Sequence, residues 1–415
     1  MKFVPGFLPS KSAPLFANGP WPPGTSFTVP IPGLPPISIN TTQMGFCGGM
    51  SFLTRDIFES GMPQLRGLVA ADIPAALAQL ILHRLIDSFD GPATVAKWLA
   101  FTQKLDHDTV FGGPGVFHMT VSECAAIMTD IDAGILCPIG VVLAQSLAPW
   151  AVFQNHAELV WGYDLTGSQL TLHVYDCNNP ARDDITIGLD ISSPTPAKDI
   201  FTNGTYGPTY DHVRGFFRLP YTHADPSAAY IDDAVVTVST PPPAQMTPGS
   251  HAAVEVTALN TGSTSWTPSH NYRLGSQAPQ DNSIWGTGRV DLLASQVDPQ
   301  QTARFQFQIT APDQSADEQF CWQMVHETVH WFGAPSADIP VAVGANSPLC
   351  QQLHTQHVAL VTQYQNIEAD LAMIDWSDRQ AARAEAATLS RQADAIQQQI
   401  AALEERQAAN GCAPG

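Results

Sequence analysis

Cys47 and His156 are the residues whose types and surroundings could do chemistry together in this chain. Cys47 lies in the stretch GFCGGMS at 45–51, where a proline-rich segment ends and a helical pattern begins. A helix N-terminus stabilises a thiolate, because its unpaired N–H groups and the helix dipole favour negative charge. The two glycines after Cys47 would let another segment come close. A buried cysteine in a glycine-rich turn is the alternative, but the pairing with His156, which opens a strand-like segment, favours a thiol enzyme.

This chemistry needs a third group beside the thiol and the imidazole. An ordinary thiol, with a pKa of about 8.5, is mostly protonated at neutral pH, so a neighbouring imidazole must take its proton. His156 would be this base and later the acid, and Asp176 would hold its other ring nitrogen. Asn178 would face the same side of a strand as Asp176, so it is a second orienting candidate. The oxyanion hole would combine the Cys47 N–H with a side-chain amide, for which Gln43 is the nearest candidate.

Length and composition narrow the classes of protein. A chain of 415 residues predicts about two or three domains, and 44% hydrophobic residues exclude a disordered composition. The formal net charge of −20, with no basic patch, argues against a nucleic-acid partner. No apolar run is long enough for a membrane span, and Pro5 comes too early for a signal peptide. These features leave the localisation open between the cytoplasm and export by a non-classical route.

The order of predicted elements places helices before strands. Residues 1–40 form a proline-rich arm that we expect to be extended and to cover the first domain. Apolar spacing predicts helices from Cys47 to about Ala133. Strands follow, predicted at Cys137–Ala144, His156–Tyr163 and Gln169–Tyr175, with Gly167-Ser168 as a hairpin turn, and a closing strand near Arg214–Phe217.

This order and two local motifs resemble the papain-like cysteine peptidases, in particular the bacteriocin-processing type. The segment 155–164, NHAELVWGYD, is similar to the family's histidine strand, and 170–180, LTLHVYDCNNP, is similar to the strand that carries its third residue. The resemblance covers roughly residues 40–225 and implies Cys47 as nucleophile, His156 as base, Asp176 as orienting residue, and a peptide or protein substrate, with no cofactor. The family's oxyanion glutamine would fall at Thr41, whereas the chain has Gln43, and the family's two-cysteine signature is absent. A catalytically inactive scaffold or binding protein is therefore the alternative.

A second module follows a predicted proline-rich linker at 229–244. Alternation of apolar and polar residues with regular turn signals predicts an Ig-like β-sandwich over 245–345. Trp266, Trp285, Trp322 and Trp331, with their neighbours, resemble the four-tryptophan Ig-like domain of an autophagy cargo receptor. The resemblance implies a protein partner or a surface glycan; the other interpretation is that these tryptophans pack in the core and at its rim.

The string His326-Glu327-Thr328-Val329-His330 has the H-E-x-x-H pattern of zinc peptidases. On a helix both histidines would share one face and could bind zinc, with the glutamate as base. However, Phe320, Trp322 and Met324 alternate as in a strand, and Ser336 stands where the extended zinc motif has a third histidine. A hairpin is therefore predicted, no metal site is assigned, and a zinc metallopeptidase is the minor alternative.

The last segment, 347–412, carries two heptad-like series interrupted at 375–378. This pattern predicts an antiparallel helical hairpin or part of a coiled coil, which could mediate oligomerisation. Folding back would bring Cys350 near Cys412, where either a disulfide or two free thiols would fit. The predicted fold class is therefore α+β and multidomain: a papain-like domain at 41–228, an Ig-like sandwich and a helical tail.

Overall fold

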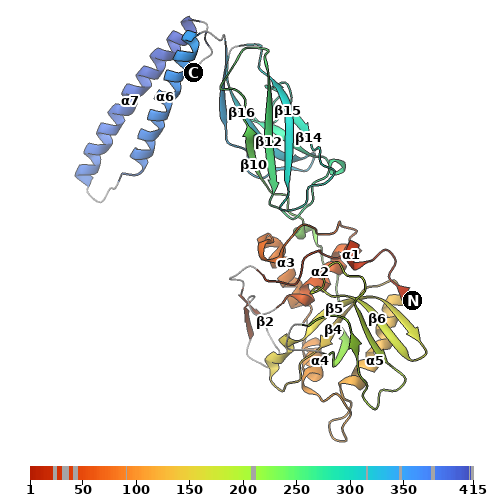
Figure 1. The fold of residues 1–415 in the computed structure, drawn as a ribbon. Coiled ribbons are helices and arrows are strands. Elements are labelled where there is room, and N and C mark those ends of the chain that lie inside the picture. Colours follow the sequence, from red (N-terminus) through yellow and green to blue (C-terminus); the bar gives the residue numbers. More distant parts are fainter. Residues whose placement is uncertain are drawn as a thin grey trace. The chain divides into compact units, whose positions relative to one another are not determined.

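The structure is a computed structural model of the chain. It describes residues 1–21, 26–29, 37–40, 45–89, 91–206, 212–314, 316–344, 348–374, 379–410 and 412. The protein is α+β, with several β-sheets and a C-terminal pair of helices (Figure 1). It divides into two compact units. The first comprises 1–232 with 261–265 and 298–301, and the second comprises 233–260, 266–297 and 302–415.

The first unit is built on a seven-stranded sheet with the strand order β8-β7-β6-β5-β4-β9, and β1 also pairs with β5. Every pairing in this sheet is antiparallel. Its strands are β1 (Lys2–Phe3), β4 (Cys137–Val142), β5 (His156–Thr166), β6 (Gln169–Tyr175), β7 (Thr186–Asp190), β8 (Phe201–Thr202) and β9 (Gly215–Arg218). A separate hairpin pairs β2 (Ser26–Val29) with β3 (Ile37–Asn40).

Helices of this unit pack on the sheet, with α2 against β5, α3 against α2, and α5 against β5 and β9. The apolar spacing predicted from the sequence is confirmed, because Ile81, Leu85 and Ile127 all lie buried in the core. The helices are α1 (Pro9–Ser12), α2 (Cys47–Glu59), η1 (Ala70–Asp72), α3 (Ala75–Asp87), α4 (Pro92–Gln103), α5 (Val116–Asp132), η2 (Pro149–Gln154) and η3 (Ser227–Ala229).

Residues 1–21 contribute to the core of the first unit, whereas the sequence predicts only that they cover it. Lys2 and Phe3 form β1 on the sheet, and Phe7, Phe16 and Trp21 are buried in the main core. Aromatic side chains of this size contribute much of the apolar area that a core buries. The proline-rich parts at 22–25 and 30–36 lie outside the described residues.

The second unit contains two sheets around one core. One sheet has the order β10-β12-β15, and the other has β11-β18-β16-β13-β14, with β17 paired to β16. Trp266, Trp285 and Trp322 lie fully buried in this core. The elements are β10 (Ala234–Thr240), β11 (Gln245–Met246), β12 (His251–Asn260), η4 (Pro268–His270), β13 (Tyr272–Gln277), β14 (Arg289–Asp291), β15 (Thr302–Thr310), β16 (Ala316–His326), β17 (His330–Phe332) and β18 (Ile339–Val343).

Residues 229–244 are not the linker that the sequence predicts. They contain strand β10, which pairs with β12 over most of its length. The sequence AVVTVST is rich in β-branched residues that favour a strand, and the three prolines at 241–243 come only after it. The proline run therefore ends a strand instead of separating two modules.

Two helices complete the chain, α6 (Pro348–Ala372) and α7 (Arg379–Ala409), and they pack against each other. Cys350 and Cys412 are joined by a disulfide, so the helical hairpin is closed at that end. The predicted turn at 375–378 lies outside the described residues. Within the described part of the chain, none of the helices combines the length and the apolar character that a membrane span requires.

Candidate active site

The predicted residues lie at the N-terminus of α2, at the start of β5 and just after the end of β6. Cys47 is the first residue of α2, His156 is the first residue of β5, and Asp176 directly follows β6. Strands β5 and β6 form an antiparallel hairpin around the turn at Gly167, whose φ is +61°. The start of one strand therefore lies beside the end of the other, and this places His156 next to Asp176.

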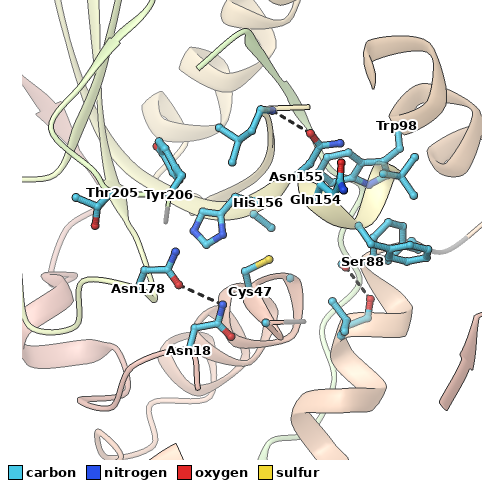
Figure 2. Close-up of a pocket in the computed structure, with 18 residues that line it drawn as sticks. Asn18, Cys47, Ser88, Trp98, Gln154, Asn155, His156, Asn178, Thr205 and Tyr206 are labelled. Atoms are coloured by element: carbon cyan, nitrogen blue, oxygen red, sulfur yellow. Dashed lines mark hydrogen bonds between the residues drawn. The ribbon is translucent and has the colours of Figure 1, made fainter. Parts of the chain in front are cut away.

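A hydrogen bond from Ser51 to Ala157 holds helix α2 beside His156. Ser51 lies one turn after Cys47 on the same face of α2, and its hydroxyl donates to the carbonyl oxygen of Ala157 at 3.3 Å. Because Ala157 follows His156 directly, this bond fixes the first turn of α2 at the beginning of β5. Figure 2 shows Cys47 and His156 next to each other at the same cavity.

The glycines after Cys47 are required by close packing between helices, as the sequence predicts. A Cβ on Gly49 would lie 2.0 Å from the carbonyl oxygen of Ile81, and a Cβ on Gly48 would lie 2.3 Å from the Ser88 hydroxyl. Helix α3 could not approach the first turn of α2 if either position carried a side chain. The GG pair therefore places α3, and with it one wall of the cavity, beside Cys47.

His156 is buried and hydrogen-bonded to a buried carboxylate. Its Nε2 lies 2.8 Å from Oδ1 of Asp176, and the two side chains are 6% and 0% exposed. Burial alone would lower the pKa of His156, but Cys47 and Asp176 raise it well above its ordinary value. The bond through Nε2 leaves Nδ1 as the ring nitrogen available to Cys47, which lines the same cavity. These two neighbours, Cys47 and Asp176, therefore favour the protonated form of the His156 ring.

Asp176 is kept ionised by several donors. Burial opposes its charge, but His156, the backbone N–H of Asn178 and the side-chain amide of Asn179 lower its pKa below the ordinary value. The Asn178 N–H donates to Oδ1 at 2.9 Å, and Asn179 Nδ2 donates to Oδ2 at 2.5 Å. Asp176, and not the side chain of Asn178, is therefore the group that contacts the imidazole in the structure. Asn178 lines the cavity and accepts a bond from Asn18.

The sequence prediction of the site did not include Asn18. Its Oδ1 accepts from the backbone N–H of Phe46 at 2.6 Å, and its Nδ2 donates to Oδ1 of Asn178 at 3.2 Å. Asn18 thus connects the residue before Cys47 with the loop after Asp176 (Figure 2). A Cβ on Gly45 would lie 2.2 Å from Nδ2 of Asn18, so Gly45 is needed for this approach. Nothing in the sequence spacing signals the role of Asn18, and Gln43 lies outside the described residues.

The cavity at Cys47 has a volume of about 470 Å³ and is lined by both apolar and polar side chains. Ser88, Gln154 and Asn155 lie on the side of Trp98, and Cys47, His156, Asn18 and Asn178 lie on the other side (Figure 2). Its lining contains no Lys, Arg, Asp or Glu among the residues that the structure describes. The larger apolar side chains of the lining are Leu85, Phe89, Trp98, Leu143, Val152 and Phe153.

In the described part of the chain, three or more side chains of the types that bind metals come close together at one place. Ligand atoms of His156, Asp176 and Cys177 lie within 4.8 Å of one another. His156 and Asp176 use the relevant atoms to bind each other, and burial raises the pKa of Cys177 well above its ordinary value. A buried protonated thiol is a poor metal ligand, so we assign no metal to this cluster.

The second unit places the H-E-x-x-H string on the hairpin of β16 and β17. His326 and His330 are paired across the two strands with ring centroids 6.0 Å apart, and the chain reverses at Thr328, whose φ is +65°. Glu327 is bound to Arg289 at 2.7 Å. As direct cross-strand partners the two histidines share one face of the hairpin, but no third ligand-type side chain among the described residues is grouped with them, and the glutamate already has a cationic partner.

Comparisons with known proteins assign no family to the chain. No protein-family model matches it, and no curated protein matches it. Among solved structures, a CARDB domain from Pyrococcus furiosus is 17% identical over 27% of this chain and 94% of that chain, with a TM-score of 0.20. A protein of unknown function from Porphyromonas gingivalis W83 is 12% identical over 45% of this chain and 88% of that chain, with a TM-score of 0.15. A putative membrane anchored protein from Corynebacterium diphtheriae is 12% identical over 50% of this chain and 52% of that chain, with a TM-score of 0.16.

Proposed function

We propose that the first unit is a papain-like thiol hydrolase that cleaves peptide bonds or related acyl bonds. Cys47 is the nucleophile, His156 is the base and then the acid, and Asp176 orients the imidazole. The observation that carries this proposal is that His156, which lines one cavity together with Cys47 at a helix N-terminus, contacts the buried Asp176 at 2.8 Å.

The proposed reaction follows from these positions. The Cys47 thiolate attacks the substrate carbonyl carbon, a C–S bond forms, and the carbonyl electrons move onto oxygen. The imidazolium of His156 protonates the leaving amine as the C–N bond breaks. Water then attacks the thioester, with His156 accepting its proton, and releases the acid and the thiol. Asp176 stays ionised throughout and stabilises the imidazolium.

Asn18 is the best candidate for the second donor of the oxyanion hole. The backbone N–H of Cys47 belongs to the first turn of α2, where helical N–H groups have no intrahelical acceptor. The amide nitrogen of Asn18 has two hydrogens, and one of them binds Asn178. Its second hydrogen is suited to bind the developing oxyanion in the cavity.

Alkylation of the full chain by iodoacetamide tests this function. We expect Cys47 to react fast below about pH 7 in the native chain and slowly in His156→Ala. Cys124 and Cys321 are internal controls, because burial raises their pKa values to about 12 and about 11. If Cys47 reacts no faster than these thiols and does not respond to His156→Ala, the hydrolase proposal is wrong and the inactive scaffold replaces it.

A peptide library then separates hydrolysis from simple thiol reactivity. Native chain should cleave peptides or peptide esters, and Cys47→Ser should not. An activated Cys47 without cleavage of any acyl substrate would favour the binding protein over the enzyme. The control for folding is the thermal unfolding of Cys47→Ser, which should match that of the native chain.

For the second unit, we propose an Ig-like module that binds a protein partner or a surface glycan. The proposal rests on Trp331, which is half-buried and lies under the guanidinium of Arg289 at 4.7 Å from the ring centroid. Of the four tryptophans, the other three are buried in the core and support packing instead. The test measures binding of the full chain to a glycan array and to surface proteins. Loss of binding in Trp331→Ala would support this role, and an unchanged binding pattern would reject it.

For the helical pair, we propose a role in oligomerisation. Val358 and Met373 are exposed apolar side chains on and after α6, 45% and 75% exposed. Sedimentation of the full chain tests the proposal: we expect an oligomer that Val358→Glu with Met373→Glu converts to a monomer. A native monomer at all accessible concentrations would reject it.

A further inference from the structure

A second carboxyl lies next to the proposed active site, and the mechanism above does not use it. Glu158 follows His156 by two residues in β5, so both side chains lie on the same face of the strand. Glu158 is 0% exposed. Its Oε1 accepts a hydrogen bond from the hydroxyl of Tyr206 at 2.8 Å, while its Oε2 has no hydrogen-bond partner among the residues that the structure describes.

A carboxyl in this position is costly to bury. A buried polar atom without a partner destabilises a protein, and a buried carboxylate does so more strongly. Burial raises the pKa of Glu158 to about 8, and the charge of Asp176 acts in the same direction. His156 and the Tyr206 hydroxyl act in the opposite direction. An apolar residue would fill the same core position without this cost, which points to a use for the carboxyl.

Tyr206 connects Glu158 with the imidazole. Its ring packs edge-on against that of His156, with centroids 5.5 Å apart, and it lines the cavity (Figure 2). The neighbouring Thr205 accepts a bond from Asn179 at 3.4 Å, and Asn179 also donates to Asp176. The segment around Tyr206 is therefore attached both to Glu158 and to the donor that holds Asp176.

We propose that Glu158 and Tyr206 are a positioning pair for His156, in which the buried carboxyl holds the phenol against the imidazole and so keeps the His156–Asp176 hydrogen bond aligned and shielded from water. This role rests on the proposed thiol chemistry. A hydrogen bond to an ionised group is stronger where water is excluded, so the Tyr206 ring strengthens the bond that orients the base. Asp176, His156, Tyr206 and Cys177 are the titratable groups that interact with Glu158.

The chain offers a matched control for this pair. Tyr221 donates to the buried carboxylate of Asp56 at 2.6 Å, and neither residue lines the cavity at Cys47. Tyr221→Phe thus removes a tyrosine–carboxyl bond of the same kind, in the same unit, away from the proposed chemistry. A role in stability alone would make Tyr206→Phe and Tyr221→Phe behave alike.

The test is the pH profile of Cys47 alkylation by iodoacetamide, measured for the full native chain, for five variants of the pair and its control, and for His156→Ala. We expect Tyr206→Ala to lower the rate at neutral pH about 10-fold, since the imidazole loses its alignment. Glu158→Gln and Tyr206→Phe should shift the profile along the pH axis, and Tyr221→Phe should reproduce the native profile. The double variant of Glu158→Gln and Tyr206→Phe should do no more than the larger single change, because both substitutions disrupt one unit.

Each outcome decides between the two proposals. If His156→Ala slows the labelling but Glu158→Gln and Tyr206→Phe keep the native profile, the pair has no positioning role, and the thiol hydrolase stands. If His156→Ala leaves the labelling unchanged, the hydrolase fails and the positioning role fails with it. Should Tyr206→Ala not fold, the two conservative variants decide the matter alone, because both keep the size of the side chain.

Discussion

The chain contains two histidine motifs that a sequence search would select, and their surroundings in the structure differ. His156 is buried, bonded to an ionised Asp176 and next to Cys47. His326 and His330 lie on a hairpin, where His326 stacks on Tyr272 at 4.2 Å and Glu327 pairs with Arg289. The two motifs differ in burial and in the groups that their side chains bind. Residue types become a site only where the fold removes water and points their reactive atoms at one another.

The largest expected effect is on the rate of chemistry at the first motif. His156→Ala should lower hydrolysis, and the alkylation of Cys47, about 10²- to 10⁴-fold, because the thiol loses its base. His330→Ala in the second unit is the matched control and should leave both rates unchanged. Equal rates for the two variants would remove the distinction between the motifs.

The proposed oxyanion donor should give a smaller loss. Asn18→Ala should lower kcat about 10²-fold with little change in KM, because this contact would strengthen only as the oxyanion forms. Since Asn18 also binds the Phe46 N–H, the circular dichroism of the variant must match that of the native chain. A rise in KM at constant kcat would instead indicate that Asn18 binds the ground-state substrate.

The close packing of α2 and α3 should be visible in stability. Gly49→Ala should lower the free energy of unfolding by about 1–3 kcal/mol, because its Cβ would meet the carbonyl oxygen of Ile81. Gly188→Ala is the comparison, since a Cβ there meets nothing closer than 3.9 Å and its φ is not positive. Urea unfolding measures both. An equal loss in the two variants would contradict the packing argument.

The ion pair at the site should make stability depend on pH. The pKa of Asp176 is lowered in the folded state, so its contribution to stability is present above about pH 3.9, the unfolded value, and is lost as the pH falls through the folded value. The stability difference between the native chain and Asp176→Asn should therefore shrink as the pH falls through the folded pKa of Asp176. Urea unfolding at several pH values measures it, and a difference that grows in acid would reverse the assigned sign.

The smallest effect is expected at the second motif. Zinc or EDTA should leave the melting temperature of the full chain unchanged, because no third ligand-type side chain of the described residues joins His326 and His330, and Glu327 is held by Arg289. The variant His326→Ala should show the same indifference. A rise in melting temperature with zinc, lost in the variant, would restore a metal site to this hairpin.

Much of the local structure could be predicted from the sequence, because local patterns decide it. Helix α2 begins at Cys47, and β5 begins at His156, as expected. The turn at Gly167 and the hairpin of the H-E-x-x-H string also follow from residue types that favour those conformations. The papain-like and Ig-like assignments stay proposals, since they depend on arrangements that no comparison tests.

Other features could not be predicted, because they depend on contacts between distant segments. The prolines at 241–243 predict a linker where the structure has strand β10, because the pairing of β10 with β12 joins segments that are separate in the sequence. Asn18 reaches Phe46 and Asn178 only because the start of the chain packs beside α2 and the loop after β6. No spacing in the sequence marks such a contact.

The sequence by itself determined which groups could react: one cysteine at a helix start, a histidine that opens a strand, and an aspartate after the next strand. Propensity and periodicity are local, so these positions can be read along the chain. Only the tertiary structure decided which groups meet. It brought His156 to Asp176, placed Glu158 and Tyr206 beside them, and left His326 and His330 on a hairpin. Burial and hydrogen bonding are properties of the packed chain, and they separate a reactive histidine from an ordinary one.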